Sequence, residues 1–212
     1  MRLKKPKSLT SREWYCIQVA AHFTAGNRWA TQPLLRRAIV TERLPERMFS
    51  ELFLQLSLLL GFPTMLEGFS ILRTVSDKSQ EGPEHSFVEG KAENEGRKVL
   101  KRVYGSAVDR LLVNLKTMHD VVPSVIVRDV YGRILSRPGL SLRERELINV
   151  AVLSIQGLEQ QLYSHIRGAL RMQAEIKAIR SAIVLAARIA ASDPAKSLRL
   201  LLSIAQSKNG RS

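Results

Sequence analysis

Two distant segments of the chain begin with the same pattern of residues. Residues 8–19 read SLTSREWYCIQV, and residues 141–152 read SLRERELINVAV. The positions that match at one constant offset are Ser8/Ser141, Leu9/Leu142, Arg12/Arg145, Glu13/Glu146 and Val19/Val152. In each half a proline, Pro63 or Pro194, later opens a helical segment that follows a long apolar one. This internal similarity predicts two copies of one helical unit, at about 8–73 and 141–207.

Short polar patterns mark the expected starts of helices. Thr10-x-x-Glu13 and Ser141-x-x-Glu144 are capping-box patterns, and Asp193-Pro194 provides an N-cap followed by proline in the first turn. No segment shows convincing strand alternation, so we expect an all-α fold. The predicted helices cover residues 11–25, 28–40, 45–60, 63–73, 95–103, 106–117, 121–135, 142–156, 159–171, 174–190 and 194–207.

The segment 74–94 interrupts the helical pattern. It is polar, contains Gly82-Pro83 and lacks apolar periodicity, which is typical of a mobile linker. The predicted organisation is therefore a first helical unit over 1–75, a polar linker over 76–94, and a second unit with its connecting helices over 95–212. Apolar residues of the connecting helices are expected to pack between the units or against another subunit.

Cysteine usage and hydropathy bear on the cellular compartment. Cys16 is the single cysteine, so no internal disulfide can form and a reducing compartment fits, although a secreted protein without disulfides would look the same. The basic N-terminus is not followed by a signal-type apolar core. The most apolar stretches, Leu52–Phe62 and Ile179–Ala191, are shorter than the roughly 18–20 residues that span a bilayer. We expect a cytoplasmic protein without a membrane span.

The formal net charge of +14 favours an anionic partner, which includes a small carboxylate and does not exclude nucleic acid. The basic residues are spread along the chain, however, which equally fits a solvated basic surface. The long apolar helices expected over Leu52–Phe62 and Ile179–Leu202 carry more apolar surface than one small bundle can hide. They therefore predict a homo-oligomer with helices at the interface.

The region from Tyr131 to Leu170 contains several motifs in order. It reads YGRILSRPGLSLRERELINVAVLSIQGLEQQLYSHIRGAL, with a Tyr-Gly pair, an Arg-Pro-Gly-Leu-Ser turn, an Arg-Glu-Leu step and a Gln-Leu-x-x-His-x-Arg-x-Ala-Leu helix. This order and spacing resemble the signature region of the carboxymuconolactone decarboxylase / alkylhydroperoxidase D-like (AhpD-like) superfamily, and weaker similarity covers both units. The resemblance implies an AhpD-like all-α fold in a homo-oligomer, commonly a trimer or hexamer. It also implies either decarboxylation of γ-carboxymuconolactone or thiol peroxidase chemistry.

The peroxidase branch of this superfamily resembles Glu…Cys-x-x-Cys-x-x-x-His. The glutamate and the histidine match Glu146 and His165, but the cysteine positions hold Leu158 and Gln161. Because peroxide reduction needs a reactive thiolate, we expect no thiol peroxidase activity. The lone Cys16 does not match either cysteine position and is expected to be a small core residue.

The pair Glu146 and His165 is the expected catalytic centre. Two antiparallel helices joined at Gly157 would bring these residues to levels about 5 Å apart along the helix axis. The functional interpretation is a general acid/base pair in the second unit only, since Glu13 of the first unit would face Gln32 in place of a histidine. The structural alternative is that Glu146 caps a helix or pairs with an arginine, while His165 is a satisfied core histidine. The residues expected to bind the substrate are Arg137, Arg167, Tyr131 and Gln161.

The remaining histidines, His22, His85 and His119, do not have metal-ligand spacing, so we predict no metal and no cofactor. Trp14 and Trp29 are expected in the core. Two function classes stay open. The first is a cofactor-free, decarboxylase-like (lyase) or isomerase-like enzyme that acts on a small carboxylated or lactone substrate. The second is a non-catalytic, oligomeric family member that binds an anionic partner through its basic surface.

Overall fold

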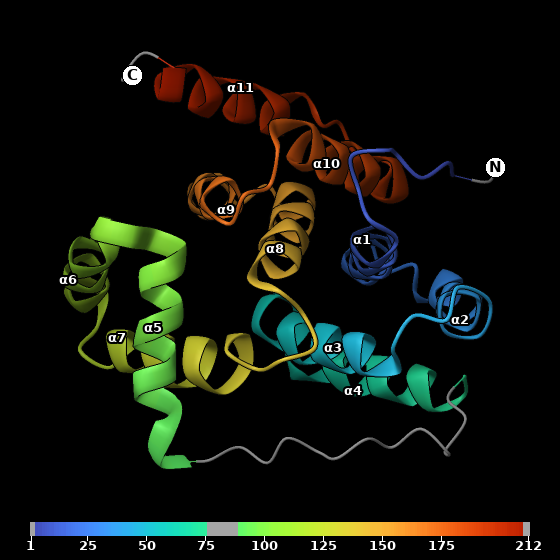
Figure 1. Cartoon of the computed structure of the whole chain (residues 1–212), viewed down its shortest axis with the longest axis horizontal. Coiled ribbons are helices and arrows are strands. Elements are labelled where there is room, and N and C mark those ends of the chain that lie inside the picture. The colour runs from blue at the N-terminus through green and yellow to red at the C-terminus, as the bar shows by residue number, and fades with distance from the viewer. Residues whose placement is uncertain (1–2, 76–88, 210–212) are drawn as a thin grey trace.

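The computed structural model of the chain describes residues 3–75 and 89–209. Every regular element in these two ranges is a helix, which confirms the predicted all-α fold (Figure 1). The α-helices are α1 Ser11–Thr24, α2 Thr31–Arg36, α3 Glu46–Leu60, α4 Phe62–Arg73, α5 Ala92–Tyr104, α6 Val108–Met118, α7 Val122–Ser124, α8 Leu142–Gln156, α9 Glu159–Arg171, α10 Ile176–Ala190 and α11 Ala195–Asn209. Short 3-10 or π-helical segments are η1 Arg28–Ala30, η2 Arg37–Thr41, η4 Glu89–Lys91, η5 Gly105–Ala107 and η6 Val125–Leu135.

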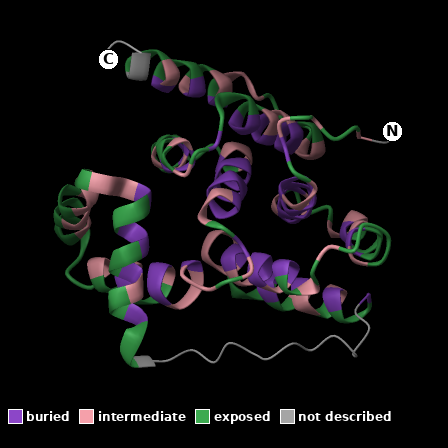
Figure 2. Cartoon of the chain, viewed as in Figure 1, coloured by how far each residue is buried: buried purple, intermediate pink, exposed green. Residues whose placement is uncertain are grey.

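Helix α8 lies in the middle of the molecule, with α1, α9 and α10 packed around it (Figure 1). Every residue from Glu144 to Leu153 is buried (Figure 2). The sequence is apolar on nearly all sides of this helix, and such a helix is stable only when other elements cover it all round. Polar side chains on α8 are therefore taken out of water and need partners inside the protein.

Helices α1 and α8 are held together by two reciprocal ion pairs. Nε of Arg12 on α1 lies 2.6 Å from Oε1 of Glu144, and Nε of Arg143 on α8 lies 2.7 Å from Oε1 of Glu13. Both acids also complete the capping boxes that the sequence predicts, with Thr10 and Ser141 as N-caps. Each glutamate thus accepts from its own helix start and from the opposite helix.

These caps change the register of the predicted repeat. Thr10 corresponds to Ser141, and Glu13 to Glu144, an offset two residues shorter than the one that pairs Ser8 with Ser141. The expected equivalence of Glu13 with Glu146 is therefore wrong. The residue matches at the longer offset therefore do not reflect equivalent positions on the two helices.

One apolar core takes residues from both predicted units, including Ile17, Phe53, Leu147 and Ile183. The helices expected to present apolar surface to a partner are thus largely covered within the chain, because Leu52–Phe53 and Ile179 are fully buried. Phe62 and Leu202, at the ends of the two stretches, are nevertheless 64% and 57% exposed, so the expected oligomer stays a prediction. A second, smaller core joins α5 to η6, so the connecting helices pack on each other.

The structure bears on the two tryptophans, the predicted linker and the predicted absence of a membrane span. Trp14 is buried, but Trp29 is 90% exposed on the short segment η1, so its core assignment is wrong. Most of the predicted linker, residues 76–88, and with it His85, lies outside the described residues. Among the described helices, none combines the length and the apolar character that crossing a bilayer requires.

Candidate functional site

The side chains of Glu146 and His165 meet between α8 and α9. Gly157 ends α8 in the left-handed conformation, which lets the chain reverse and run back as α9. Nδ1 of His165 lies 3.0 Å from Oε2 of Glu146. The Glu146 side chain is 2% exposed and the His165 side chain 16%, so the imidazole lies between a buried carboxylate and solvent.

The carboxylate fits at this place because position 168 is a glycine. A Cβ at Gly168 would overlap Oε2 of Glu146 and would lie 3.1 Å from Cγ1 of Val103. The close approach of α9 to the carboxylate is therefore open only to glycine. This small residue sits one turn after His165 on the same helix and belongs to the site as a spacer.

A hydrogen-bond network fixes the amides beside the imidazole. Gln55 accepts from Nη1 of Arg145 and donates from Nε2 to the Arg145 carbonyl, so its orientation is determined. The same Nε2 donates to Oδ1 of Asn149 over 2.7 Å, which leaves the Asn149 amide nitrogen 3.2 Å from Nδ1 of His165. With Glu146 ionised, Nδ1–H donates to the carboxylate, so the Asn149 amide packs beside this atom without donating to it, and Nε2 is left to exchange a proton with a bound molecule.

Two tyrosines lie within electrostatic reach of the carboxylate. The Tyr131 hydroxyl donates to that of Tyr104 over 3.4 Å, and the rings pack edge to face. Burial, then Tyr104 and the negative charge of Glu146 raise the pKa of Tyr131 well above its usual value. Burial also raises the pKa of Tyr104, with a further contribution from Glu146. Both hydroxyls therefore keep their protons and act as donors at neutral pH.

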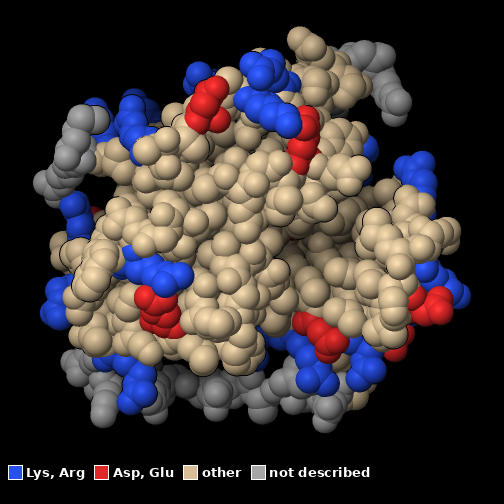
Figure 3. Space-filling model, turned by 180° about the vertical axis from the view of Figure 1, so that it is seen from behind, with Lys and Arg blue, Asp and Glu red and all other residues tan. Residues whose placement is uncertain are grey.

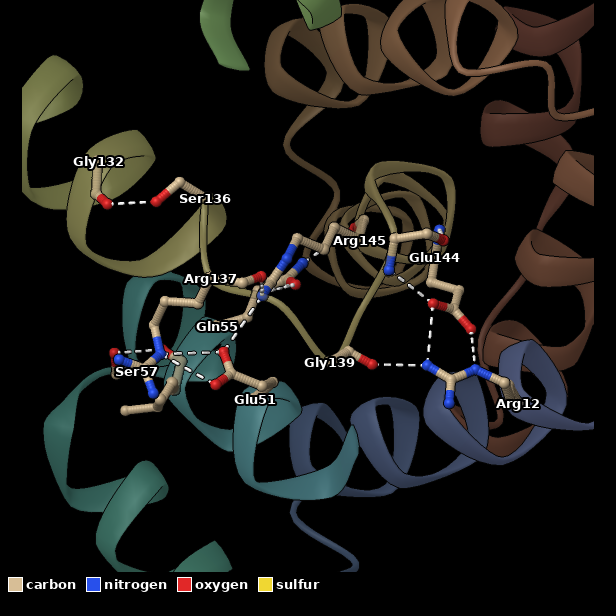
Figure 4. Close-up of polar contacts among 12 residues, drawn as sticks. Arg12, Glu51, Gln55, Ser57, Gly132, Ser136, Arg137, Gly139, Glu144 and Arg145 are labelled. Atoms are coloured by element: carbon tan, nitrogen blue, oxygen red, sulfur yellow. Dashed lines mark hydrogen bonds and ion pairs between the residues drawn. The ribbon is translucent and has the colours of Figure 1, made fainter. Parts of the chain in front are cut away.

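A buried arginine anchors the start of α8 to α3 (Figure 4). Nη2 of Arg145 lies 3.2 Å from Oε2 of Glu51 and donates to the carbonyl of Arg137. Glu51 also accepts from Nε of Arg137 over 2.9 Å. The contacts run from Arg137 through Glu51 and Arg145 to the side-chain amides of Gln55 and Asn149, and end at His165. This buried cluster therefore helps to hold the side chains next to His165 in place.

The four residues predicted to bind the substrate lie in different surroundings. Tyr131 is buried beside the pair, as described above. Arg137 is already bound to Glu51, and its side chain is 22% exposed. Arg167 is exposed, stacks over the ring of Tyr163 and donates to its hydroxyl. Gln161 is exposed on the first part of α9. No described hydrogen bond or ion pair joins Arg137, Arg167 or Gln161 to Glu146 or His165.

Sequence reasoning missed Asn149 and Tyr104. Asn149 lies one turn after Glu146 on the buried helix, and a polar residue in such an apolar run is a signal that could have found it. Tyr104 comes from α5 and reaches the pair only through tertiary packing, which no local pattern reports. Nη1 of Arg171 donates to the carbonyl of Val103, so a further cation lies next to Tyr104.

The predicted counterpart in the first unit is wrong. Glu13 accepts from Arg143 and from the Thr10 backbone, whereas Nε2 of Gln32 donates to Oγ1 of Thr74. The two side chains do not pair. Counted from the two N-caps, Tyr15 stands at the position of Glu146 and Gln18 at that of Asn149.

Cys16 is fully buried in the core, as the sequence predicts. Burial, with a smaller contribution from Glu144, raises the pKa of its thiol far above the usual value. The sulfur is therefore protonated and shielded at neutral pH.

Figure 3 shows the face of the molecule opposite to that of Figure 1. Its surface is hollowed on one side, and Lys and Arg lie scattered around the rim while the centre of the face carries little charge. On this face the basic residues do not form a continuous patch.

An all-α fold with a carboxylate and an imidazole on two antiparallel helices is the arrangement that the sequence motifs predict for AhpD-like proteins. Residues 126–203 match the model of the carboxymuconolactone decarboxylase family. A 4-carboxymuconolactone decarboxylase of Acinetobacter baylyi is 36% identical over 74 residues, which cover 34% of this chain and 55% of that protein. The chain thus spans about half the length of the curated relative that it matches. Over residues 126–203 the chain is therefore similar to the carboxymuconolactone decarboxylase family, and Tyr131, Glu146 and His165 all lie inside this segment.

Proposed function

We propose that the protein is a cofactor-free, decarboxylase-like enzyme for a small carboxylated or lactone substrate. The observation that carries the proposal is the 3.0 Å contact between His165 and a carboxylate that is almost fully buried. A buried carboxylate that orients an imidazole leaves the second ring nitrogen for proton transfer. The 36% identical segment of the Acinetobacter enzyme supports decarboxylation as the reaction class.

The proposed reaction releases the substrate carboxylate as CO2. The C–C bond breaks, and its electron pair passes to the adjacent carbon and into the unsaturated lactone. Protonated His165 then delivers the proton on Nε2 to that carbon and is recharged from water, so one proton is consumed for each CO2 released. The ionised Glu146 stabilises the imidazolium form through Nδ1–H.

Substrate orientation is assigned to residues around this pair. The Tyr104 hydroxyl is half-buried at the edge of the site and can donate to a lactone oxygen. Arg171, held by the Val103 carbonyl next to Tyr104, takes the role of carboxylate anchor in place of Arg137 and Arg167.

Release of CO2 from 4-carboxymuconolactone tests this function. The wild-type protein should accelerate release, and Glu146→Gln should slow it by about 10²-fold or more, because a neutral amide no longer favours the imidazolium. Wild-type protein without any effect on this substrate or on related carboxylated lactones would contradict the proposal.

The alternative function is a non-catalytic, oligomeric protein that binds an anionic partner. The net charge of +14 favours it, whereas the basic residues on the face that Figure 3 shows are scattered and form no continuous surface for nucleic acid there. Binding of duplex DNA that weakens steeply as salt rises, together with absent turnover, would favour this alternative.

We also propose that the protein assembles with itself. Apolar side chains remain exposed on α6 and just after it, including Val113 at 63% and Met118 at 74%. No residue of α6 is buried within the chain. Light scattering should therefore give a mass above 23.8 kDa, and a stable monomer at micromolar concentration would contradict this assembly.

A further inference from the structure

A pocket of about 720 Å³ opens in the first half of the chain, away from the Glu146–His165 pair. Its walls come from α1, from the segment η1–η2, from the residues before α1 and from the end of α10. The volume is in the range of about 300–1,000 Å³ that is usual for small-molecule sites. The lining residues are Leu3, Lys5, Ser11, Trp14, Tyr15, Gln18, His22, Ala30, Pro33, Leu34, Arg37, Glu42, Arg188 and Ile189.

The pocket combines an apolar wall with a few placed polar groups. Trp14 and Tyr15 are buried, and Leu34 and Ile189 are partly buried. The Tyr15 hydroxyl donates to Oε1 of Glu42 over 3.3 Å. An apolar wall with few convergent polar groups is the usual composition of a ligand site, because the wall holds the body and the polar groups fix its orientation.

One lining histidine has an unused polar atom. Nδ1 of His22 is shielded from solvent and has no hydrogen-bond partner among the described residues. Burial lowers the pKa of His22, so the ring is neutral near pH 7. His22 therefore contributes a neutral ring to the lining of the pocket and no positive charge.

The charge of the lining is positive. The lining contains three basic side chains and one acidic side chain, namely Lys5, Arg37 and Arg188 against Glu42. Glu42 lies 3.7 Å from Nη2 of Arg37, which is a long contact between two side chains that are each more than a third exposed. Because guanidinium groups bind carboxylates in a planar, two-point geometry, this excess of cations selects an organic anion.

The pocket is lined by α1, the helix whose capping box at Thr10 matches that of α8 at Ser141. Counted from these N-caps, its lining residues Tyr15 and Gln18 stand where α8 carries Glu146 and Asn149. Helix α1 thus carries an aromatic ring at the position where α8 carries the buried carboxylate. The tyrosine in place of the glutamate removes the carboxylate that would orient a proton-transfer group, while the pocket can still bind a ligand.

We propose that this pocket is a second ligand site, which binds a small organic carboxylate with an apolar body. Arg37 and Arg188 hold the carboxylate, Trp14 and Leu34 contact the body, and the site binds without catalysing a reaction. It is independent of the function proposed for Glu146 and His165.

Calorimetric titration with benzoate, benzamide and acetate tests the site. Benzoate has both the charge and the apolar ring, so it should bind at least about fivefold more tightly than benzamide or acetate, each of which lacks one of them. The double variant Arg37→Gln/Arg188→Gln should weaken benzoate binding about tenfold or more. The control Arg36→Gln/Arg199→Gln removes the same charge from exposed positions outside the pocket and should leave the affinity within about twofold.

A further variant separates this site from the proposed active site. His165→Gln should leave benzoate affinity unchanged whether or not the protein is a decarboxylase. Absence of benzoate binding up to about 10 mM would overturn the second site. Equal weakening in both double variants would also overturn it, as would loss of binding in His165→Gln.

Discussion

Gly168 on α9 leaves the space that the carboxylate of Glu146 occupies, since a Cβ at position 168 would overlap Oε2 of Glu146. The position of the buried acid is therefore set from the opposite helix. A methyl group would have to move either the carboxylate or α9, and both changes alter the contact with His165.

Gly168→Ala should therefore cost about 1–3 kcal/mol of stability and reduce activity. The control is Gly90→Ala, because a Cβ at Gly90 meets no atom within 4 Å. This control should be neutral or slightly stabilising. Thermal unfolding and turnover of both variants decide the matter, and a Gly168→Ala protein that equals the wild type in both would contradict the packing described here.

The buried ion pair of Arg145 and Glu51 should be a strong determinant of stability when only one partner is removed. Their side chains are 1% and 2% exposed. Glu51→Gln leaves a buried guanidinium without its counter-charge, so we expect a loss of about 3–5 kcal/mol in urea unfolding. Glu93→Gln breaks an exposed pair with Arg97 and should cost no more than about 0.5 kcal/mol. Similar losses in the two variants would be inconsistent with the buried network.

The pair of Arg12 and Glu144 predicts acid sensitivity. Burial by itself would raise the pKa of Glu144, but hydrogen bonds from Arg12 and from the Ser141 backbone outweigh it and lower this pKa below 4.5. A carboxylate with a lowered folded-state pKa stabilises the protein above its unfolded-state pKa, and this contribution is lost as pH falls through the folded-state value.

Glu144→Gln should accordingly be less stable than the wild type at pH 7. Its stability should also fall less between about pH 6 and pH 3, because the titrating group is absent. Chemical unfolding at several pH values in this range measures how the free energy of unfolding of each protein depends on pH. Parallel pH dependence of the two proteins would show that Glu144 does not supply the effect.

Cys16 should be unreactive in the folded protein. Its thiol is fully buried, and burial raises its pKa, so neither access nor thiolate is available. A thiol reagent should modify it only after unfolding, and assays with dithiols and peroxide should give no turnover. Peroxidase turnover that disappears in Cys16→Ser would contradict this and would make Cys16 the nucleophile.

Local patterns in the sequence predict most of the fold. The capping boxes at Thr10 and Ser141 and the N-cap at Asp193 all form, with Asp193 accepting from the Ala195 backbone. These signals work because helix ends must satisfy their own backbone donors within a few residues. Glu146 and His165 meet for a similar reason, since the short turn at Gly157 fixes how α9 returns along α8.

Features that depend on tertiary packing could not be predicted in this way. Tyr104 joins the pair from another part of the chain, and Arg137 is captured by Glu51 of α3. The first-unit assignment of Gln32 failed because a two-residue shift of register rotates a helical position to another face. The pocket around Tyr15 and Arg37 likewise depends on how three separated segments meet.

The rate of CO2 release from 4-carboxymuconolactone by His165→Gln, compared with the control His119→Gln, tests the acid/base proposal most directly. His119 is exposed at the end of α6, where its Nδ1 accepts from the Val121 backbone, so its loss should not affect the rate. His165→Gln should lower the rate by about 10²–10⁴-fold while circular dichroism shows an intact helical fold. A folded His165→Gln protein that releases CO2 as fast as the His119→Gln control would contradict a catalytic role for His165.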